Sequence, residues 1–282
     1  YHYSAQLGQE YADTQATSKG VPIKLGHNHD YARSVAVAVK EGRSPDDFVG
    51  DLRRNGKWTV STPTLYRYID RGYIPGVTNK NLLEKSKRKR RNNHVHLAAR
   101  PPKGLSIERR LHEINTRSTF GHWEMDSVIG HAKGKRESFL VLTERKTRFE
   151  MIFRVSTKTS ASTVRALERA LSKFPQGTFQ TITVDNGSEF QDCFGMEYDG
   201  KNNKRVTVYY CHPFTSCERG SNERANRIIR RFFPKGKSLK PYTQKDCDKA
   251  AAFMNSMHRK ILNYSTAEEL FFQELELLKT TA

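Results

Sequence analysis

Three acidic residues, Asp126, Asp185 and Glu223, stand in local sequences that suit a metal-dependent nuclease. Asp185 follows the β-branched run 181–184 and precedes an Asn-Gly pair, so it should lie at the exposed carboxyl end of a buried strand. Asp126 lies within a predicted strand, and Glu223 lies near the start of a predicted helix. Each acid is therefore positioned by a different element.

Carboxylates that converge repel one another unless cations neutralise them. Hard divalent ions with oxygen ligands, Mg²⁺ or Mn²⁺, are their natural partners. Two such ions about 3.5 to 4 Å apart activate a water or a 3′-hydroxyl and stabilise the leaving oxygen of a phosphodiester displacement. We therefore expect Asp126, Asp185 and Glu223 to be the catalytic residues and also the ligands of two ions.

The predicted strand 122–130 places Glu124 and Asp126 on one face, because side chains alternate along a strand. If this strand neighbours the strand before Asp185, the two aspartates can share a metal ion. The helix that carries Glu223 could then close the site.

Three other acids compete for these roles. Glu124 could support the metal ligands from behind, Glu189 could support the short helix after Asp185, and Glu218 lies in a predicted loop. From spacing alone, each of the three chosen acids could equally be structural.

The helix around Glu223 is predicted to have two different sides. One side is an apolar stripe that should face a core, formed by Ala225, Ile228, Ile229 and Phe232. The opposite side carries Glu223 and the cations Arg227, Arg230 and Arg231. Such a surface suits a phosphate backbone, and the residues expected to contact DNA here are Asn226, Arg227, Arg230 and Lys235.

The composition points to a polyanionic partner. The chain of 282 residues is long enough for real cores, and its hydrophobic share of 36% argues against wholesale disorder. Its formal net charge of +19 favours a polyanion. No membrane span or signal peptide is visible, so a cytoplasmic location is expected. The cysteines form no CxxC pair, and a zinc site around Cys211, His212 and Cys217 is a weak alternative to ordinary packing. The first residue is Tyr1, which suggests a fragment or a processed form.

Short helices are predicted before residue 80. After a helix at 31–40, Ser44-Pro45 offers a cap and a first-turn proline for a second helix, and Thr62-Pro63 begins a third. The pair matches a helix-turn-helix with Thr64, Tyr66 and Arg67 facing a DNA groove, although an ordinary helical hairpin is the alternative.

A dense basic run follows at 85–91. It could be a solvated linker or could contact phosphates through Lys87, Arg88, Lys89, Arg90 and Arg91. The remaining order of predicted elements, β-β-β-α-β-α-β-α-α, describes an α/β domain with a mixed sheet covered by helices. The expected divisions are an incomplete helical segment at 1–40, a helix-turn-helix region at 41–80, a basic linker at 81–118 and a catalytic domain at 119–282.

Several motifs together resemble the DDE transposases of the IS-thirty family of bacterial insertion sequences, which are relatives of the retroviral integrases. They are GHWEMD at 121–126, TERKTRF at 143–149, DNGSEF at 185–190, HPF with ERGSNE ending at 223, FPKG at 233–236 and LNYSTAEELF at 262–271. The resemblance covers most of the chain. It implies an RNase H-like catalytic domain with Asp126, Asp185 and Glu223 as the triad, and a helix-turn-helix that helps to bind terminal inverted repeats.

The resemblance also implies a bacterial, nucleoid-associated protein that binds target DNA and acts as a homodimer, because two DNA ends are held at once. Three departures from the family pattern are visible. The interval from Asp185 to Glu223 is slightly long, Cys217 stands where a tryptophan is common, and the usual extra N-terminal DNA-binding segment is missing.

Two other functions compete with a transposase. A catalytically silent or truncated copy would act as a DNA-binding repressor of transposition and would keep salt-dependent DNA affinity without the three acids. A structure-selective RNase H-type nuclease would share the site but would not need the helix-turn-helix.

Overall fold

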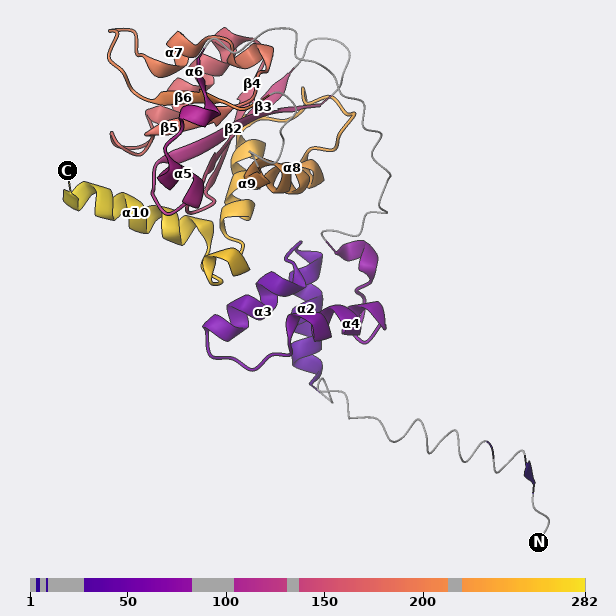
Figure 1. The fold of residues 1–282 in the computed structure, drawn as a ribbon. Coiled ribbons are helices and arrows are strands. Elements are labelled where there is room, and N and C mark those ends of the chain that lie inside the picture. Colours follow the sequence, from indigo (N-terminus) through magenta and orange to yellow (C-terminus); the bar gives the residue numbers. More distant parts are fainter. Residues whose placement is uncertain are drawn as a thin grey trace. The chain divides into compact units, whose positions relative to one another are not determined.

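The computed structural model describes residues 28–82, 104–130, 137–212 and 220–281, together with residues 4, 5 and 9. The chain divides into two compact units, Tyr1–Lys85 and Ser86–Ala282. Figure 1 shows helices in the first unit and a sheet with surrounding helices in the second. No helix within the described ranges is long and apolar enough to cross a membrane.

The first unit is built from α2 (His29–Lys40), α3 (Pro45–Arg54) and α4 (Thr62–Asp70), followed by the short η1 (Asn79–Asn81). The predicted cap of α3 is present, because the Ser44 hydroxyl accepts from Asp47 N; α4 has a cap that was not predicted, in which the Ser61 hydroxyl accepts from Thr64 N. All three helices contribute to one core, which includes Val35, Val39, Phe48, Val49, Leu65 and Ile69. The structure therefore has no boundary at residue 40, where we expected one, because the buried side of α2 packs on α3 and α4.

The second unit contains a six-stranded mixed sheet with the strand order β1-β6-β5-β2-β3-β4. Its strands are β1 (Leu105–Ser106), β2 (His122–Ile129), β3 (Ser138–Glu144), β4 (Glu150–Val155), β5 (Thr181–Val184) and β6 (Thr207–Tyr210). The predicted antiparallel meander is β2-β3-β4. Strands β5, β6 and β1 continue the sheet in parallel from β2.

Helices cover both faces of this sheet (Figure 1). On one face, α6 (Ser160–Leu171) and α10 (Ala267–Thr281) pack on β2 residues such as Trp123 and Met125. On the other face, α8 (Gly220–Phe232) and α9 (Gln244–Asn255) pack on Val128 and its neighbours. The alternation of β2 predicted these two faces, and the α/β fold class is confirmed.

Two expected boundaries differ from the structure. The expected linker at 81–118 includes β1, η2 (Ile107–Arg109) and α5 (His112–Thr116), because β1 pairs with β6 and extends the sheet. We also expected one continuous helix at 243–262. Helix α9 instead ends at Asn255, whose side chain exchanges hydrogen bonds of 2.8 and 2.9 Å with the backbone of Glu150, and η5 (Lys260–Leu262) follows. The remaining short elements are η3 (Ser188–Phe190), where a short helix was expected after Asp185, and α7 (Cys193–Glu197).

Candidate active site

The two aspartates come from neighbouring parallel strands. Strand β2 pairs with β5 so that Glu124 stands opposite Thr183. Asp126 and Asp185 each lie two residues beyond this last pair, Asp126 within β2 and Asp185 directly after β5. Adjacent strands are only about 4.8 Å apart. The sheet neighbours that we expected are therefore present, and both acids are half-buried at the same end of the sheet.

Helix α8 attaches to the end of β2 through two polar contacts. The side-chain amide of Asn226 donates to the Asp126 carboxylate at 2.7 Å, and the Arg230 guanidinium donates to the carbonyl of Ile129 at 2.7 Å. Burial lowers the pKa of Arg230, and the nearby Asp126 carboxylate partly opposes that shift. Below these contacts, Ala225 and Ile229 are buried against the sheet.

Glu223 lies in α8, three residues before Asn226. Positions three apart on a helix share one side. The backbone position of Glu223 is thus one turn from the residue that contacts Asp126. Its side chain lies outside the described part of the chain.

Side-chain hydrogen bonds from Asp185 and Asn186 hold the turn after β5 in place. The Asp185 carboxylate accepts from Gly187 N at 2.9 Å, and the Asn186 amide donates to the Cys211 carbonyl at 2.8 Å. Because Cys211 follows β6 directly, these bonds fix the turn to the neighbouring strand. The Asn-Gly turn therefore holds Asp185 at the strand end, as its sequence indicated.

Glu189 and Lys158 form an ion pair beside this turn. The Glu189 carboxylate lies 2.8 Å from Lys158 Nζ and the residue is 4% exposed. We expected Glu189 to support the short helix after Asp185. The sequence carries no signal for Lys158, because the contact joins the residue before the α6 cap to a short helix far along the chain.

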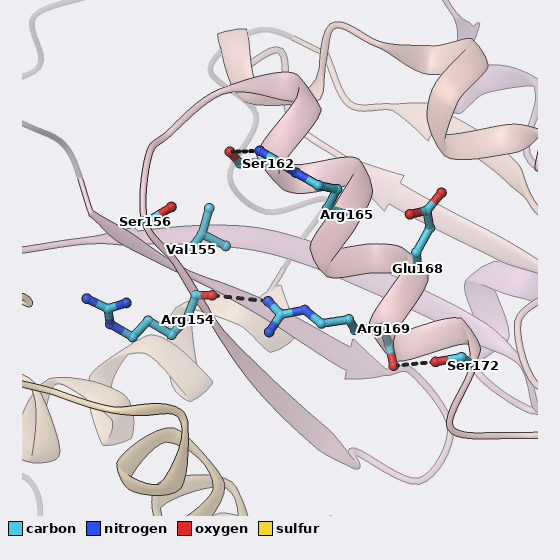
Figure 2. A pocket seen from close by; sticks show the side chains of 8 residues that line it. All are labelled: Arg154, Val155, Ser156, Ser162, Arg165, Glu168, Arg169 and Ser172. Carbon is cyan, nitrogen blue, oxygen red and sulfur yellow. Dashed lines mark hydrogen bonds between the residues drawn. The ribbon is translucent and has the colours of Figure 1, made fainter. Parts of the chain in front are cut away.

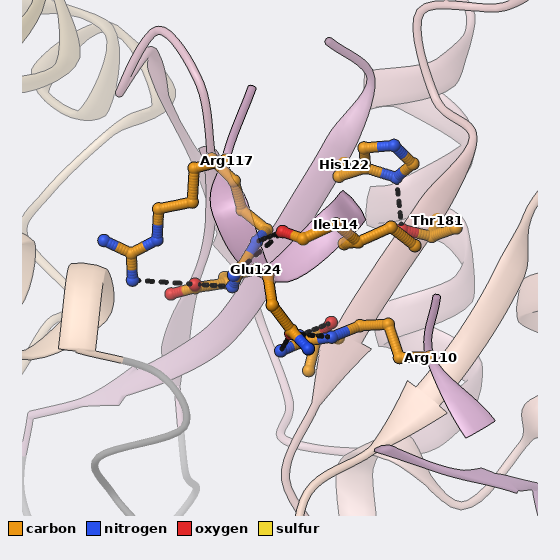
Figure 3. A network of polar contacts seen from close by, with 9 residues as sticks. Arg110, Ile114, Arg117, His122, Glu124 and Thr181 are labelled. Carbon is orange, nitrogen blue, oxygen red and sulfur yellow. Dashed lines mark hydrogen bonds and ion pairs between the residues drawn. The ribbon is translucent and has the colours of Figure 1, made fainter. Parts of the chain in front are cut away.

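The opposite end of β2 carries a buried polar network (Figure 3). Glu124 pairs with Arg145, whose guanidinium also donates to the carbonyl of Ile114. His122 bonds to Thr181 at 2.8 Å, and burial together with the nearby arginines lowers its pKa to about 4. Burial also lowers the pKa of Arg145 to about 10, against the attraction of Glu124. This network joins β2, β5 and α5 behind the two aspartates.

The described side chains alone do not complete a metal site, since no group of three or more His, Cys, Asp or Glu residues within them could hold an ion. Asp126 and Asp185 supply two carboxylates, and a third ligand would have to come from a side chain such as that of Glu223. Cys217, which belongs to the weak zinc alternative, lies outside the described residues, as does the competing acid Glu218.

Comparison with known proteins identifies the family. The integrase core domain model matches residues 117–216. A probable transposase for the insertion-like sequence element IS1161 of Streptococcus salivarius is 34% identical over 86% of this chain and 69% of its own length. The transposase InsI for insertion sequence element IS30C of Escherichia coli is 28% identical over 88% of this chain and 66% of its own length. The chain belongs to the IS30 family of transposases. The resemblance stated from its motifs is confirmed.

This IS30-family chain has an RNase H-like second unit, with the integrase-core match spanning β2 to β6. Among solved structures, the catalytic core domain of BIV integrase is similar with a TM-score of 0.42 and 17% identity, over 57% of this chain and 99% of that one.

The predicted DNA-contacting residues of the transposase fall into three groups. In α4, Tyr66 and Arg67 are exposed and Thr64 is half-buried, with its hydroxyl 2.8 Å from that of Ser61. Arg227 and Lys235 are exposed, whereas Asn226 and Arg230 are half-buried and contact β2. The basic residues Lys87, Arg88, Lys89, Arg90 and Arg91 lie outside the described ranges.

A further polar groove lies between α6 and the edge strand β4 (Figure 2). Arg169 donates to the carbonyl of Arg154 at 3.1 Å, and Arg165 donates to the Ser162 hydroxyl at 3.3 Å. Glu168 also lines the groove and pairs with Arg205 at 3.6 Å. Because these cations already contact groups of the protein itself, the groove is not included in the candidate active site.

Proposed function

We propose that this transposase cleaves DNA at the ends of its insertion sequence and joins the freed 3′-hydroxyl to target DNA, in a reaction that depends on Mg²⁺ or Mn²⁺. The observation that supports the proposal is the parallel pairing of β2 with β5 through Glu124 and Thr183, because Asp126 and Asp185 each follow this pair by two residues. Divalent ions bound by such carboxylates lower the pKa of an attacking water or hydroxyl and stabilise the leaving oxygen.

In this proposal Asp126, Asp185 and Glu223 form the catalytic triad and hold two ions. The position of Glu223 supports its inclusion, since it lies one helical turn before Asn226, which donates to Asp126. The oxygen-only ligand set suits Mg²⁺ or Mn²⁺ better than softer metals. The proposed task of Asn226 is to orient Asp126, which is more specific than the DNA contact expected from the sequence.

The DNA would be held by cations outside the metal site. Arg227 and Lys235 are exposed beside the candidate site and would contact phosphates. Arg230, which the sequence suggested for the same role, donates to Ile129 and would act mainly by docking α8.

The first unit would recognise the terminal inverted repeats. Helix α4 is the recognition helix in this proposal, with Thr64, Tyr66 and Arg67 facing the groove and the basic residues 87–91 contacting the backbone. Two DNA ends have to be joined in one event, so we propose that the transposase acts as a homodimer.

The test is cleavage of a duplex that carries the terminal repeat, with Asp185→Asn as the variant. Asparagine keeps the size of the side chain but removes the charge that holds the ion, and we expect the rate to fall by about three orders of magnitude, or about 4 kcal/mol. The matched control is Glu274→Gln. Glu274 lies on α10 and pairs with Lys146, and its substitution should leave the rate unchanged. Undiminished cleavage by Asp185→Asn would overturn the assignment.

The same experiment separates the alternatives. A DNA-binding repressor would bind the repeat duplex in a salt-dependent manner but would not cleave it with either metal. An RNase H-type nuclease would prefer an RNA–DNA hybrid to the repeat duplex. The transposase proposal requires cleavage of the repeat duplex in preference to a random duplex and to the hybrid.

A further inference from the structure

Only one of the two carboxylate oxygens of Glu189 has a partner among the described residues. Its Oε1 lies 2.8 Å from Lys158 Nζ, and its Oε2 is buried without a hydrogen-bond partner among the described residues. A buried carboxylate oxygen that lacks a partner is costly, and such groups in native proteins usually have a functional or solvent partner. The unused oxygen therefore points to a ligand.

Gly187 shows where this oxygen lies. A Cβ on Gly187 would be 2.6 Å from Glu189 Oε2 and 2.9 Å from Asp185 Oδ1. Both carboxylates thus lie next to the position that a Cβ of Gly187 would occupy, and no side chain fits there. Gly187 has a φ of −61°, which any residue can adopt, so the glycine is needed for space and not for its backbone conformation.

Two carboxylates this close repel each other unless positive charge lies nearby. Lys158 supplies one positive charge, and it contacts the oxygen of Glu189 that is turned away from this spot. A divalent ion at Asp185 would supply the remainder. Its water ligands would also give Glu189 Oε2 the hydrogen-bond donors that it lacks among the described residues.

We infer that Glu189, oriented by Lys158, is a positioning residue of the divalent-ion site at Asp185. It accepts hydrogen bonds from the ion's water ligands and adds negative charge to the site. The inference rests on the proposed function, because it requires that Asp185 binds an ion. It assigns a role to a carboxylate outside the triad and to a lysine that the triad does not involve.

The test measures metal affinity directly, without DNA. Mn²⁺ is titrated into the full chain by isothermal calorimetry, and Mn²⁺ binding is followed independently by electron paramagnetic resonance. Glu189→Gln keeps the volume but removes the charge, and we expect the affinity to fall by about tenfold, the lower end of what lost outer partners of metal ligands usually cause. Lys158→Met leaves Glu189 without its anchor and should also weaken Mn²⁺ binding.

Glu274→Gln and Lys146→Met are the matched controls, because they break another Lys–Glu ion pair of 2.7 Å in the same unit. Both should bind Mn²⁺ as the unaltered chain does. Circular dichroism and thermal melting establish that each variant is folded. Gly187→Ala is the second variant, since its Cβ would displace Glu189 Oε2 and crowd Asp185 Oδ1 without deleting either carboxylate, and it should weaken Mn²⁺ binding at least as much as Glu189→Gln.

The outcomes separate the inference from the proposed function. If Glu189→Gln lowers stability but binds Mn²⁺ within twofold of the unaltered chain, Glu189 is a structural ion-pair partner and the inference is overturned. If Asp185→Asn also binds Mn²⁺ normally, the proposed metal site itself is wrong. A loss of affinity in Asp185→Asn, Glu189→Gln and Gly187→Ala, with both controls unchanged, supports both.

Discussion

Strand β2 carries two acids with opposite surroundings. Glu124 and Asp126 lie on one face, two residues apart. Glu124 is fully buried and paired with Arg145, which is itself 3% exposed. Asp126 is half-buried and accepts from the neutral amide of Asn226. Glu124 is paired with a buried cation, whereas Asp126 accepts a hydrogen bond from a neutral amide and has the partly buried Arg230 nearby.

This difference shows how one strand can combine a structural role with a chemical one. A buried ion pair stabilises a fold only while both partners remain, because either charge alone is costly. An acid held by a neutral amide keeps the affinity for a cation that metal binding needs. We therefore expect changes at the Glu124 end to cost stability and changes at the Asp126 end to cost activity.

Arg145→Met tests the structural role of Glu124 and has the largest expected effect. The variant leaves the buried Glu124 with only the more distant Arg117, at 3.9 Å, as a cation, and it removes two hydrogen bonds of 3.3 Å to Ile114. Losing one partner of a buried pair typically costs about 3–5 kcal/mol, and we expect a loss of that size in urea unfolding. Lys146→Met, at the next residue, should cost less than about 1 kcal/mol because that lysine is partly exposed. Equal losses in the two variants would contradict the comparison.

The pH dependence of stability gives a second test of the region around Glu124, because Glu150 lies in the same row of the sheet. Glu124 pairs with Thr143 across β2 and β3, and Thr143 pairs with Glu150 across β3 and β4. Burial raises the pKa of Glu150 from 4.5 to about 7. The folded chain thus keeps a proton that the unfolded chain releases above pH 4.5, so the stability contributed by Glu150 is lost as the pH rises from 4.5 through 7.

Glu150→Gln removes this dependence. Relative to the unaltered chain, the variant should gain about 2 kcal/mol of unfolding free energy between pH 5 and pH 8. Urea unfolding at the two pH values measures this difference. A constant difference between variant and unaltered chain at both pH values would mean that Glu150 titrates normally and that this end of the sheet tolerates charge.

Much of this site could be predicted from local sequence. The alternation of β2 predicted that Glu124 and Asp126 share a face, and the β-branched run before the Asn-Gly turn predicted the position of Asp185 at a strand end. Both signals act over a few residues. Both predicted features are present in the structure because hydrophobic alternation and turn chemistry do not depend on distant partners.

The partners of these acids could not be predicted in the same way. Asn226 and Asp126 are 100 residues apart, and Asn255 and Glu150 are 105 apart. Their pairing depends on how α8 and α9 pack on the sheet, which helical periodicity limits to one side but does not specify residue by residue. For the same reason the apolar stripe of α8 was predicted, whereas the contact of Arg230 with Ile129 was not.

The smallest expected effect tests the Asp126 end through its neutral partner. Asn226→Ala removes the 2.7 Å hydrogen bond to Asp126, whose carboxylate is only half-buried, so we expect a loss of only about 1 kcal/mol in unfolding free energy. Cleavage should slow by about tenfold, because an outer partner of a metal ligand has been lost. The exposed neighbour Arg227→Ala is the control for stability and should change it by less than about 0.5 kcal/mol. If Asn226→Ala instead destabilised the chain as strongly as Arg145→Met, Asp126 would belong to the structural end of the strand, and the division of β2 into a structural acid and a chemical acid would not hold.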